Sequence, residues 1–153
     1  MKRRLRSISA TEWFHLAQAV ALIPIVRLAL RLFPFQRLIR WLRRGAEAFR
    51  SRQAADEAYK RHVTWAASAA ARRLLPNRPC LTQALVVQFL LMRRHCPAQL
   101  QIGVTKEDGA LAAHAWVELD GRVLIGGPTS PSRYRRLDGL DDKIVAMREH
   151  EAS

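Results

Sequence analysis

The chain has 153 residues, 49% of them hydrophobic and 25% charged, which is typical of one globular domain with a real core. Its formal net charge of +13 lies in residues 1–79, which hold 17 basic and 4 acidic side chains, whereas residues 80–153 hold 9 of each. Because no nucleic-acid-binding motif accompanies this charge, we expect no nucleic-acid partner; an acidic protein partner, or arginines that are simply solvated, fits the basic half better.

The cysteines and histidines do not predict a metal site or a disulfide framework. The chain has two cysteines, Cys80 and Cys96, and neither they nor the five histidines have ligand spacing. Cys96 is therefore expected to be a structural thiol. A reducing, cytoplasmic location suits a free reactive cysteine. No cofactor is evident, and no glycine-rich loop predicts an ATP site.

The first 75 residues predict a helical N-terminal region. Helical spacing begins near Thr11, and Pro24 should end or kink the first helix, with a continuation to Leu32. The uncharged run from Trp13 to Val26 has 14 residues, whereas a membrane-spanning helix needs about 20. We therefore expect a buried or interfacial helix and no transmembrane segment.

Two further helices are predicted in this half. After a break at Phe33-Pro34-Phe35, a short helix sets apolar residues against a basic face made of Arg37, Arg40, Arg43 and Arg44. Such a face is solvated, docks a protein, or contacts a membrane surface peripherally. Small residues at intervals of three and four from Glu47 to Leu75 then predict one long helix that supports the next.

That next helix is predicted to begin with a cysteine. Asn77 is a plausible N-cap and Pro79 suits the first turn, so Cys80 falls at the helix start. Unpaired N–H groups there stabilise a thiolate, the reactive form of cysteine; the alternative is a small buried apolar residue. The predicted packing stripe is Leu81, Ala84, Leu85, Gln88, Phe89 and Met92, which turns Cys80, Gln83 and Val87 to another face.

Three strands should follow, over Leu100 to Val104, Ala112 to Leu119 and Arg122 to Ile125. Alternation places His114, Trp116 and Glu118 on one face, with Trp116 expected to pack and Glu118 to form an ion pair or a strand pair. A two-residue turn at Asp120-Gly121 would set Leu119 opposite Arg122 and His114 opposite Gly127. Further predictions are a loop from Gly126 to Pro131, tethers at Tyr134 and Leu137, and a terminal helix from Asp138 to Glu151.

Several of these stretches resemble a known family. They are Cys80-Leu81-x-x-Ala84-Leu85, Leu100-x-Ile102-Gly103-Val104, His114-Ala115-Trp116-Val117-Glu118 and Asp120-Gly121-Arg122. Together they resemble the B2 proteins of lasso-peptide biosynthesis, which have a transglutaminase-like, papain-like core. The resemblance implies an α+β fold: a helical region over 1–75 packed on a core over 76–153, in one compact domain, with a catalytic helix and a small antiparallel sheet.

The resemblance also implies a function. It makes the protein a cysteine protease that removes the leader from a lasso-peptide precursor, with Cys80 as nucleophile and His114 as general base. Its partners would be the precursor peptide, a separate leader-binding protein and an ATP-using lasso cyclase. Where the family commonly has a third, carboxylate residue, this chain has Gly126.

The missing carboxylate leaves alternatives open. A substitute would come from Thr129, Ser130 or Asp138, or a Cys–His dyad would suffice. A non-catalytic scaffold and a transglutaminase-like acyl transferase are the competing hypotheses.

Overall fold

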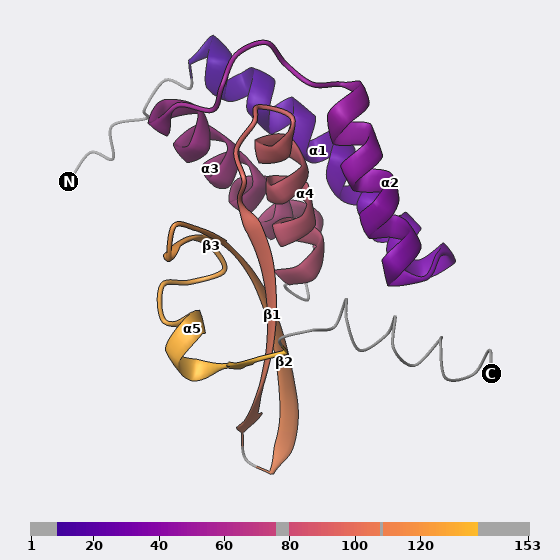
Figure 1. Cartoon of the computed structure of the whole chain (residues 1–153), viewed down its shortest axis with the longest axis vertical. Coiled ribbons are helices and arrows are strands. Elements are labelled where there is room, and N and C mark those ends of the chain that lie inside the picture. The colour runs from indigo at the N-terminus through magenta and orange to yellow at the C-terminus, as the bar shows by residue number, and fades with distance from the viewer. Residues whose placement is uncertain (1–8, 76–79, 108, 138–153) are drawn as a thin grey trace.

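A computed structural model describes residues 9–75, 80–107 and 109–137, and it shows the expected α+β architecture (Figure 1). The described residues form five helices and one four-stranded antiparallel sheet. In chain order the elements are α1 (Ala10–Leu32), α2 (Phe35–Ala48), α3 (Glu57–Leu74), α4 (Cys80–Met92), β1 (Gln99–Glu107), β2 (Ala110–Leu119), β3 (Arg122–Ile125), α5 (Ser130–Arg133) and β4 (Arg135–Arg136).

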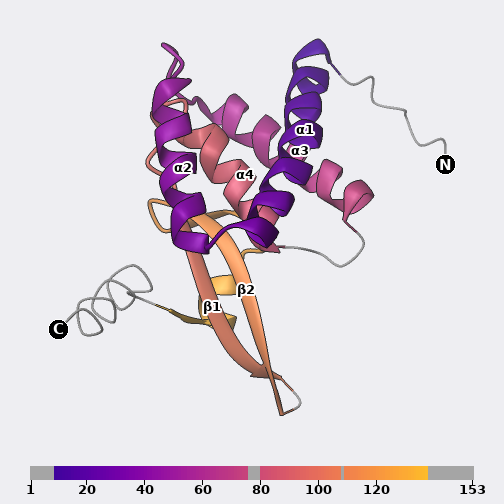
Figure 2. The same cartoon turned by 90° about the vertical axis from the view of Figure 1, so that its right-hand side faces the viewer.

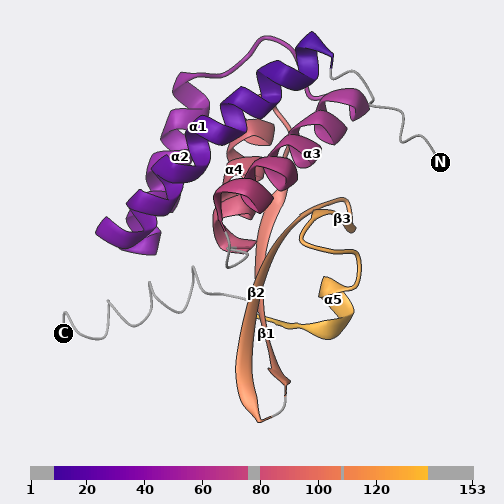
Figure 3. The ribbon, with the colours of Figure 1, turned by 180° about the vertical axis from the view of Figure 1, so that it is seen from behind.

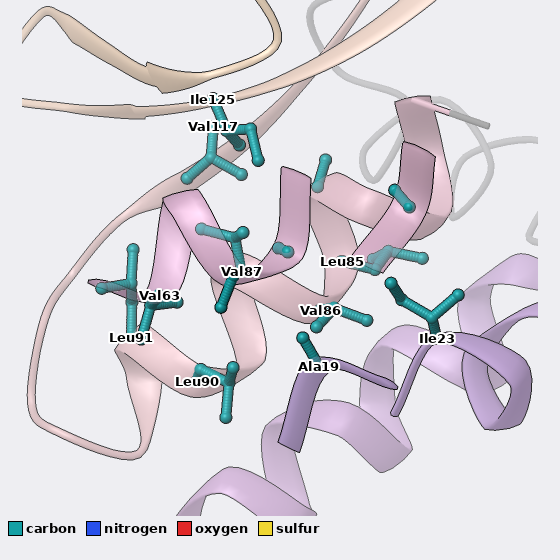
Figure 4. Packing of buried hydrophobic residues seen from close by; sticks show 14 of the residues in the cluster. Ala19, Ile23, Val63, Leu85, Val86, Val87, Leu90, Leu91, Val117 and Ile125 are labelled. Carbon is teal, nitrogen blue, oxygen red and sulfur yellow. The ribbon is translucent and has the colours of Figure 1, made fainter. Parts of the chain in front are cut away.

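Helix α4 lies at the centre of the molecule. Helices α1, α2 and α3 and strands β1 and β2 all contact it, with α1 and α2 flanking it in Figure 2. In Figure 4, Ala19 and Ile23 of α1 lie beside α4, while Val117 and Ile125 of the sheet lie beyond its opposite side. Each fully buried leucine or valine there contributes roughly 1.5–3 kcal/mol of transfer free energy.

The central position of α4 overturns the predicted single packing stripe. Buried residues run around the helix, namely Thr82, Ala84, Leu85, Val86, Val87, Leu90 and Leu91. Gln88, Phe89 and Met92, which the stripe included, are only partly buried. The prediction was wrong because a helix covered on several sides has no single apolar face to recognise.

Helix α1 is longer than the uncharged run in its sequence. Its start is fixed by a capping box, in which the Ser9 N–H donates to Glu12 Oε2 at 2.8 Å and the Glu12 N–H donates to Ser9 Oγ at 3.2 Å. Pro24 lies inside α1 on its exposed side and does not end it, so the predicted continuation to Leu32 is confirmed.

The long helix expected from Glu47 to Leu75 is divided. Helix α2 ends at Ala48, and α3 begins at Glu57, where the Asp56 carboxylate accepts a hydrogen bond from the Tyr59 N–H at 2.7 Å. Between them, the N–H groups of Ser51 and Ala55 donate to the carbonyls of Arg93 and Arg94. These tertiary hydrogen bonds and the cap outweigh the helix propensity of the alanine-rich sequence.

The sheet has the order β3-β2-β1-β4. Asp120 and Gly121 both have positive φ, 50° and 76°, as a two-residue type I′ hairpin turn requires, and Leu119 lies opposite Arg122 as predicted. A β-bulge between Val117 and Glu118 then shifts the register, so that Val117 lies opposite Ile125. The predicted pairing of His114 with Gly127 was therefore wrong, since β3 ends at Ile125.

The segment after β3 returns to the sheet, as the predicted tethers require. The Leu137 N–H donates to the Ile102 carbonyl at 2.9 Å, and Arg135 and Arg136 form β4 against Val104 and Gly103. Strand β4 was not predicted. The expected terminal helix from Asp138, the cap at Asn77 and the first-turn Pro79 lie outside the described residues.

Candidate active site

Cys80 is the first residue of α4 and is half-buried against the hydrophobic core. The first turn of a helix carries N–H groups without intrahelical partners, so a thiolate or an oxyanion is stabilised there. Helix α4 packs on β2, and its N-terminal end lies beside the middle of the β1–β2 pair (Figures 1 and 3). The two sequence-predicted site residues thus lie on elements in direct contact.

His114 lies in the middle of β2, opposite Gly103 of β1, and its side chain is partly buried. Its Nε2 atom is 2.6 Å from the Gly126 carbonyl oxygen. A carbonyl oxygen only accepts hydrogen bonds, so Nε2 must carry the hydrogen. In the neutral ring the lone pair is then on Nδ1, which is the nitrogen free to take a proton from a thiol.

The Gly126 carbonyl oxygen is itself held in place by a second donor. The buried Ser130 hydroxyl, at the start of α5, donates to the same oxygen at 2.8 Å. Among the substitutes predicted for the missing carboxylate, Ser130 thus reaches the histidine's acceptor, Thr129 is exposed, and Asp138 is outside the described residues. A backbone carbonyl occupies the position expected of a third side chain.

Gly126 leaves no room for a side chain at this point. Its φ is +106°, and an added Cβ would lie 2.4 Å from the Trp116 Cβ and 3.0 Å from the Ala115 carbonyl oxygen. Real Cβ atoms do not approach other atoms so closely, and positive φ disfavours any residue but glycine. An aspartate at residue 126 would therefore require the backbone to move.

Two aromatic rings pack beside the imidazole of His114. The Tyr134 ring centroid lies 4.9 Å away and the Trp116 ring, nearly parallel, lies 6.2 Å away. Gly103 permits this packing, because a Cβ there would lie 2.8 Å from the Tyr134 Cβ and 2.9 Å from Trp116 Cη2. The contact between Tyr134 and His114 was not predicted from the sequence; a glycine inside a predicted strand was the available signal of such a close approach.

A polar network anchors this aromatic group to β4. Trp116 is fully buried, and its Nε1–H donates to Glu118 Oε1 at 2.7 Å. Arg136 Nη2 donates to both oxygens of the same carboxylate, at 2.8 and 3.0 Å. Trp116 is thus a packing residue and Glu118 an ion-pair residue, as predicted, and the pair fixes the chain that carries Tyr134.

Cys96 differs from Cys80 in its place on the helix and in its burial. It follows the C-terminal end of α4, is 5% exposed, and burial raises the pKa of its thiol. It also lines a pocket with Glu47, Met92 and His95, at the opposite end of α4 from Cys80. This environment is that of a structural thiol, as the sequence suggested.

Among residues 9–75, 80–107 and 109–137, no cluster of three or more histidine, cysteine or acidic side chains is able to hold a metal ion.

The chemistry that Cys80 and His114 could offer is acyl transfer. A thiol at a helix start would attack a carbonyl carbon, and the imidazole on the adjoining strand would carry the proton.

The chain is an α+β domain in which a helix headed by Cys80 packs on an antiparallel sheet that carries His114. Residues 19–138 match the family described as the transglutaminase-like superfamily, and the chain therefore belongs to that superfamily. The superfamily includes cysteine peptidases, and membership of it is consistent with either a cysteine protease or an acyltransferase. Searches of curated proteins and of solved structures found no match.

The matched region extends across residue 75, and buried side chains from both halves of the chain form one core cluster. The division into a helical region over 1–75 and a catalytic core over 76–153 stays a prediction.

Proposed function

We propose that the protein is a cysteine protease that cleaves the leader from a lasso-peptide precursor. Three observations support this function: membership of the transglutaminase-like superfamily, the resemblance of the residues around Cys80 and His114 to the B2 proteins, and the geometry at His114. The observation that carries the proposal is the hydrogen bond from His114 Nε2 to the Gly126 carbonyl oxygen at 2.6 Å, which reserves Nδ1 for a proton.

In the proposed reaction, His114 Nδ1 takes the thiol proton of Cys80, and Sγ forms a bond to the carbonyl carbon at the leader–core junction. Backbone N–H groups at the start of α4 hold the oxyanion. The imidazolium gives its proton to the departing amine as the C–N bond breaks. Water then attacks the thioester, loses a proton to Nδ1, and releases the leader as a carboxylate and Cys80 as a thiol.

The Gly126 carbonyl takes over part of the role of a triad's third residue in this account. A third residue orients the imidazole, selects its tautomer and stabilises the imidazolium. A carbonyl oxygen held by Ser130 orients the ring and selects the tautomer, and its dipole supplies a weaker stabilisation of positive charge than a carboxylate would. The proposal is therefore a Cys80–His114 dyad with a backbone acceptor.

The proposed partners follow from the resemblance. They are the precursor peptide, a separate protein that binds its leader, and a lasso cyclase that closes the released core using ATP. The proposed location is the cytoplasm, where precursor peptides are made and thiols stay reduced.

Two other functions each have a specific observation in their favour. Gly126, in the position of the family's carboxylate, favours a non-catalytic scaffold of the biosynthetic complex. Superfamily membership favours an acyl transferase, in which an amine rather than water accepts the acyl group.

The proposal is tested by incubating the purified protein with a precursor and its leader-binding protein and following peptide masses over time. We expect two fragments whose masses sum to the precursor plus one water, and no fragments with Cys80→Ala. The Cys96→Ala variant is the matched control, since it removes the other thiol, and it should cleave at a rate close to wild type.

Each alternative gives a different result in the same assay. With a small primary amine added to the assay, a fragment whose new C-terminus is the amide of that amine in place of a carboxylate would assign an acyl transferase. Intact precursor with wild-type protein, while the leader-binding protein is demonstrably bound, would assign a scaffold.

A further inference from the structure

Helix α1 presents a long apolar surface that no other part of the described chain covers. We define the apolar face of α1 by its large side chains, which are 42–63% exposed: Trp13, Phe14, Val20, Ile25, Leu28 and Leu32. Between Trp13 and Leu32 the helix has ten exposed positions, and Arg31 is the only charged residue among them. The face runs for about 28 Å along the helix at 1.5 Å per residue.

The opposite side of α1 packs into the protein. Leu16, Ala19, Ile23 and Val26 are buried, and the helix contacts α3 and α4. Among the described residues, one helix, α1, is long and apolar enough to cross a membrane. Only 28% of its most apolar window is buried inside the protein. If α1 crossed a membrane, it would lose its contacts with the core. If α1 lay in the membrane surface, it would keep those contacts and bury its exposed apolar face in lipid.

The stretch between Glu12 and Glu47, which holds the apolar face of α1 and most of α2, has charge of one sign. From Trp13 to Ala46 the sequence contains six arginines and no acidic residue. Arg31, Arg37, Arg40 and Arg44 are exposed, and the packing of Phe33 against Trp41, with ring centroids 4.7 Å apart, joins the end of α1 to the basic helix α2. The exposed arginines of α2 thus follow directly on the C-terminal end of the apolar face of α1.

We propose that the apolar face of α1, together with the arginines of α1 and α2, docks the protein peripherally on an anionic lipid bilayer. Lipid fits better than an acidic protein because the face is the outer side of a single helix, and acyl chains adapt to any apolar shape. Tryptophan and arginine at the edges suit the headgroup region, and each basic residue near an anionic surface adds attraction. The proposal is independent of the peptidase function.

The test is co-sedimentation of the full chain with vesicles of phosphatidylcholine mixed with phosphatidylglycerol, beside vesicles of phosphatidylcholine alone. We expect binding to the anionic vesicles, weakened by salt. The triple variant Ile25→Gln, Leu28→Gln, Leu32→Gln should bind about tenfold more weakly or worse, since it removes three apolar side chains from the interface. Because these residues are exposed, the variant should keep the wild-type thermal unfolding curve.

The matched control is Leu111→Gln, which changes another exposed leucine, 76% exposed, on the β1–β2 hairpin away from α1. It should bind vesicles like wild type. Equal binding of the triple variant and wild type, or no preference for anionic vesicles, would overturn the proposal. The proposal would also be overturned if the protein did not bind vesicles and the triple variant Arg37→Glu, Arg40→Glu, Arg44→Glu bound the leader-binding protein more weakly. That result would assign the face to an acidic protein.

Discussion

Each end of α4 has a cysteine, with a histidine on the adjoining strand at one end and at the preceding residue at the other, and the two ends differ in ways that bear on the proposed catalysis. At the N-terminal end, Cys80 is half-buried, and His114 on the adjoining strand has one nitrogen held by a carbonyl. At the C-terminal end, Cys96 is buried, its thiol pKa is raised, and His95 Nε2 lies 3.0 Å from the Ser51 carbonyl oxygen. Both ends of α4 therefore have a cysteine and a histidine. They differ in the helix terminus that the cysteine lies at and in how deeply the cysteine is buried.

The largest expected difference is in peptidase activity. Cys80→Ala should lower the rate of precursor cleavage by about a thousandfold or more, because it removes the nucleophile. Cys96→Ala removes one buried sulfur atom and should leave the rate within about twofold, at a cost of about 1 kcal/mol in unfolding free energy. Comparable rates for the two variants would remove the distinction between the two ends.

Alkylation compares the two thiols directly in the wild-type protein. Because burial raises the pKa of Cys96 and shields its sulfur, less of it is thiolate at neutral pH, and its reaction with iodoacetamide should become appreciable only at strongly alkaline pH. At pH 7 we expect Cys80 to react faster by about a hundredfold. Peptide mass spectrometry after limited labelling measures the ratio; preferential labelling of Cys96 would contradict the account.

Substitution of Gly126 tests the close contact behind the histidine. Gly126→Ala should lower the unfolding free energy by about 2–4 kcal/mol, because it adds both positive-φ strain and a clash with Trp116. Gly109→Ala is the matched control: its φ is +83° but no atom lies within 4 Å of the added Cβ, so it should cost about 1 kcal/mol. Denaturant unfolding of both variants measures the difference, and equal losses would mean that the clash is absent.

Removal of the Ser130 hydroxyl should give the smallest effect. Ser130→Ala frees the Gly126 carbonyl oxygen from one of its two donors, so we expect about a fivefold lower cleavage rate and about 1 kcal/mol of lost stability. Ser132→Ala, which removes an exposed hydroxyl bonded to the Thr129 carbonyl, should change neither. A rate that is the same for both variants would show that Ser130 does not position the histidine's acceptor.

The sequence predicted those parts of the fold that local chemistry determines. The turn at Asp120-Gly121, the break at Phe33-Pro34 and the three main strands depend on residues a few positions apart, and they are present. The long helix from Glu47 failed because hydrogen bonds to Arg93 and Arg94, far away in the sequence, hold the intervening loop.

The candidate site was predictable in its residue types but not in its geometry. The positions of Cys80 at a helix start and His114 on a strand follow from the sequence pattern. The β-bulge between Val117 and Glu118 depends on tertiary packing and β3 ends at Ile125, so the predicted pairing of His114 with Gly127 was wrong. The hydrogen-bond acceptor of His114 is the backbone carbonyl of Gly126. Every residue has a backbone carbonyl, so the residue types in the sequence could not identify this acceptor.

The central claim is that His114 acts on Cys80, and the rate of Cys80 alkylation tests it without any substrate or partner. Iodoacetamide should modify Cys80 at pH 7 about tenfold more slowly in a folded His114→Gln variant than in wild type, because the base that takes the thiol proton is gone. Equal rates in the two proteins, with matching unfolding curves, would contradict a Cys80–His114 pair.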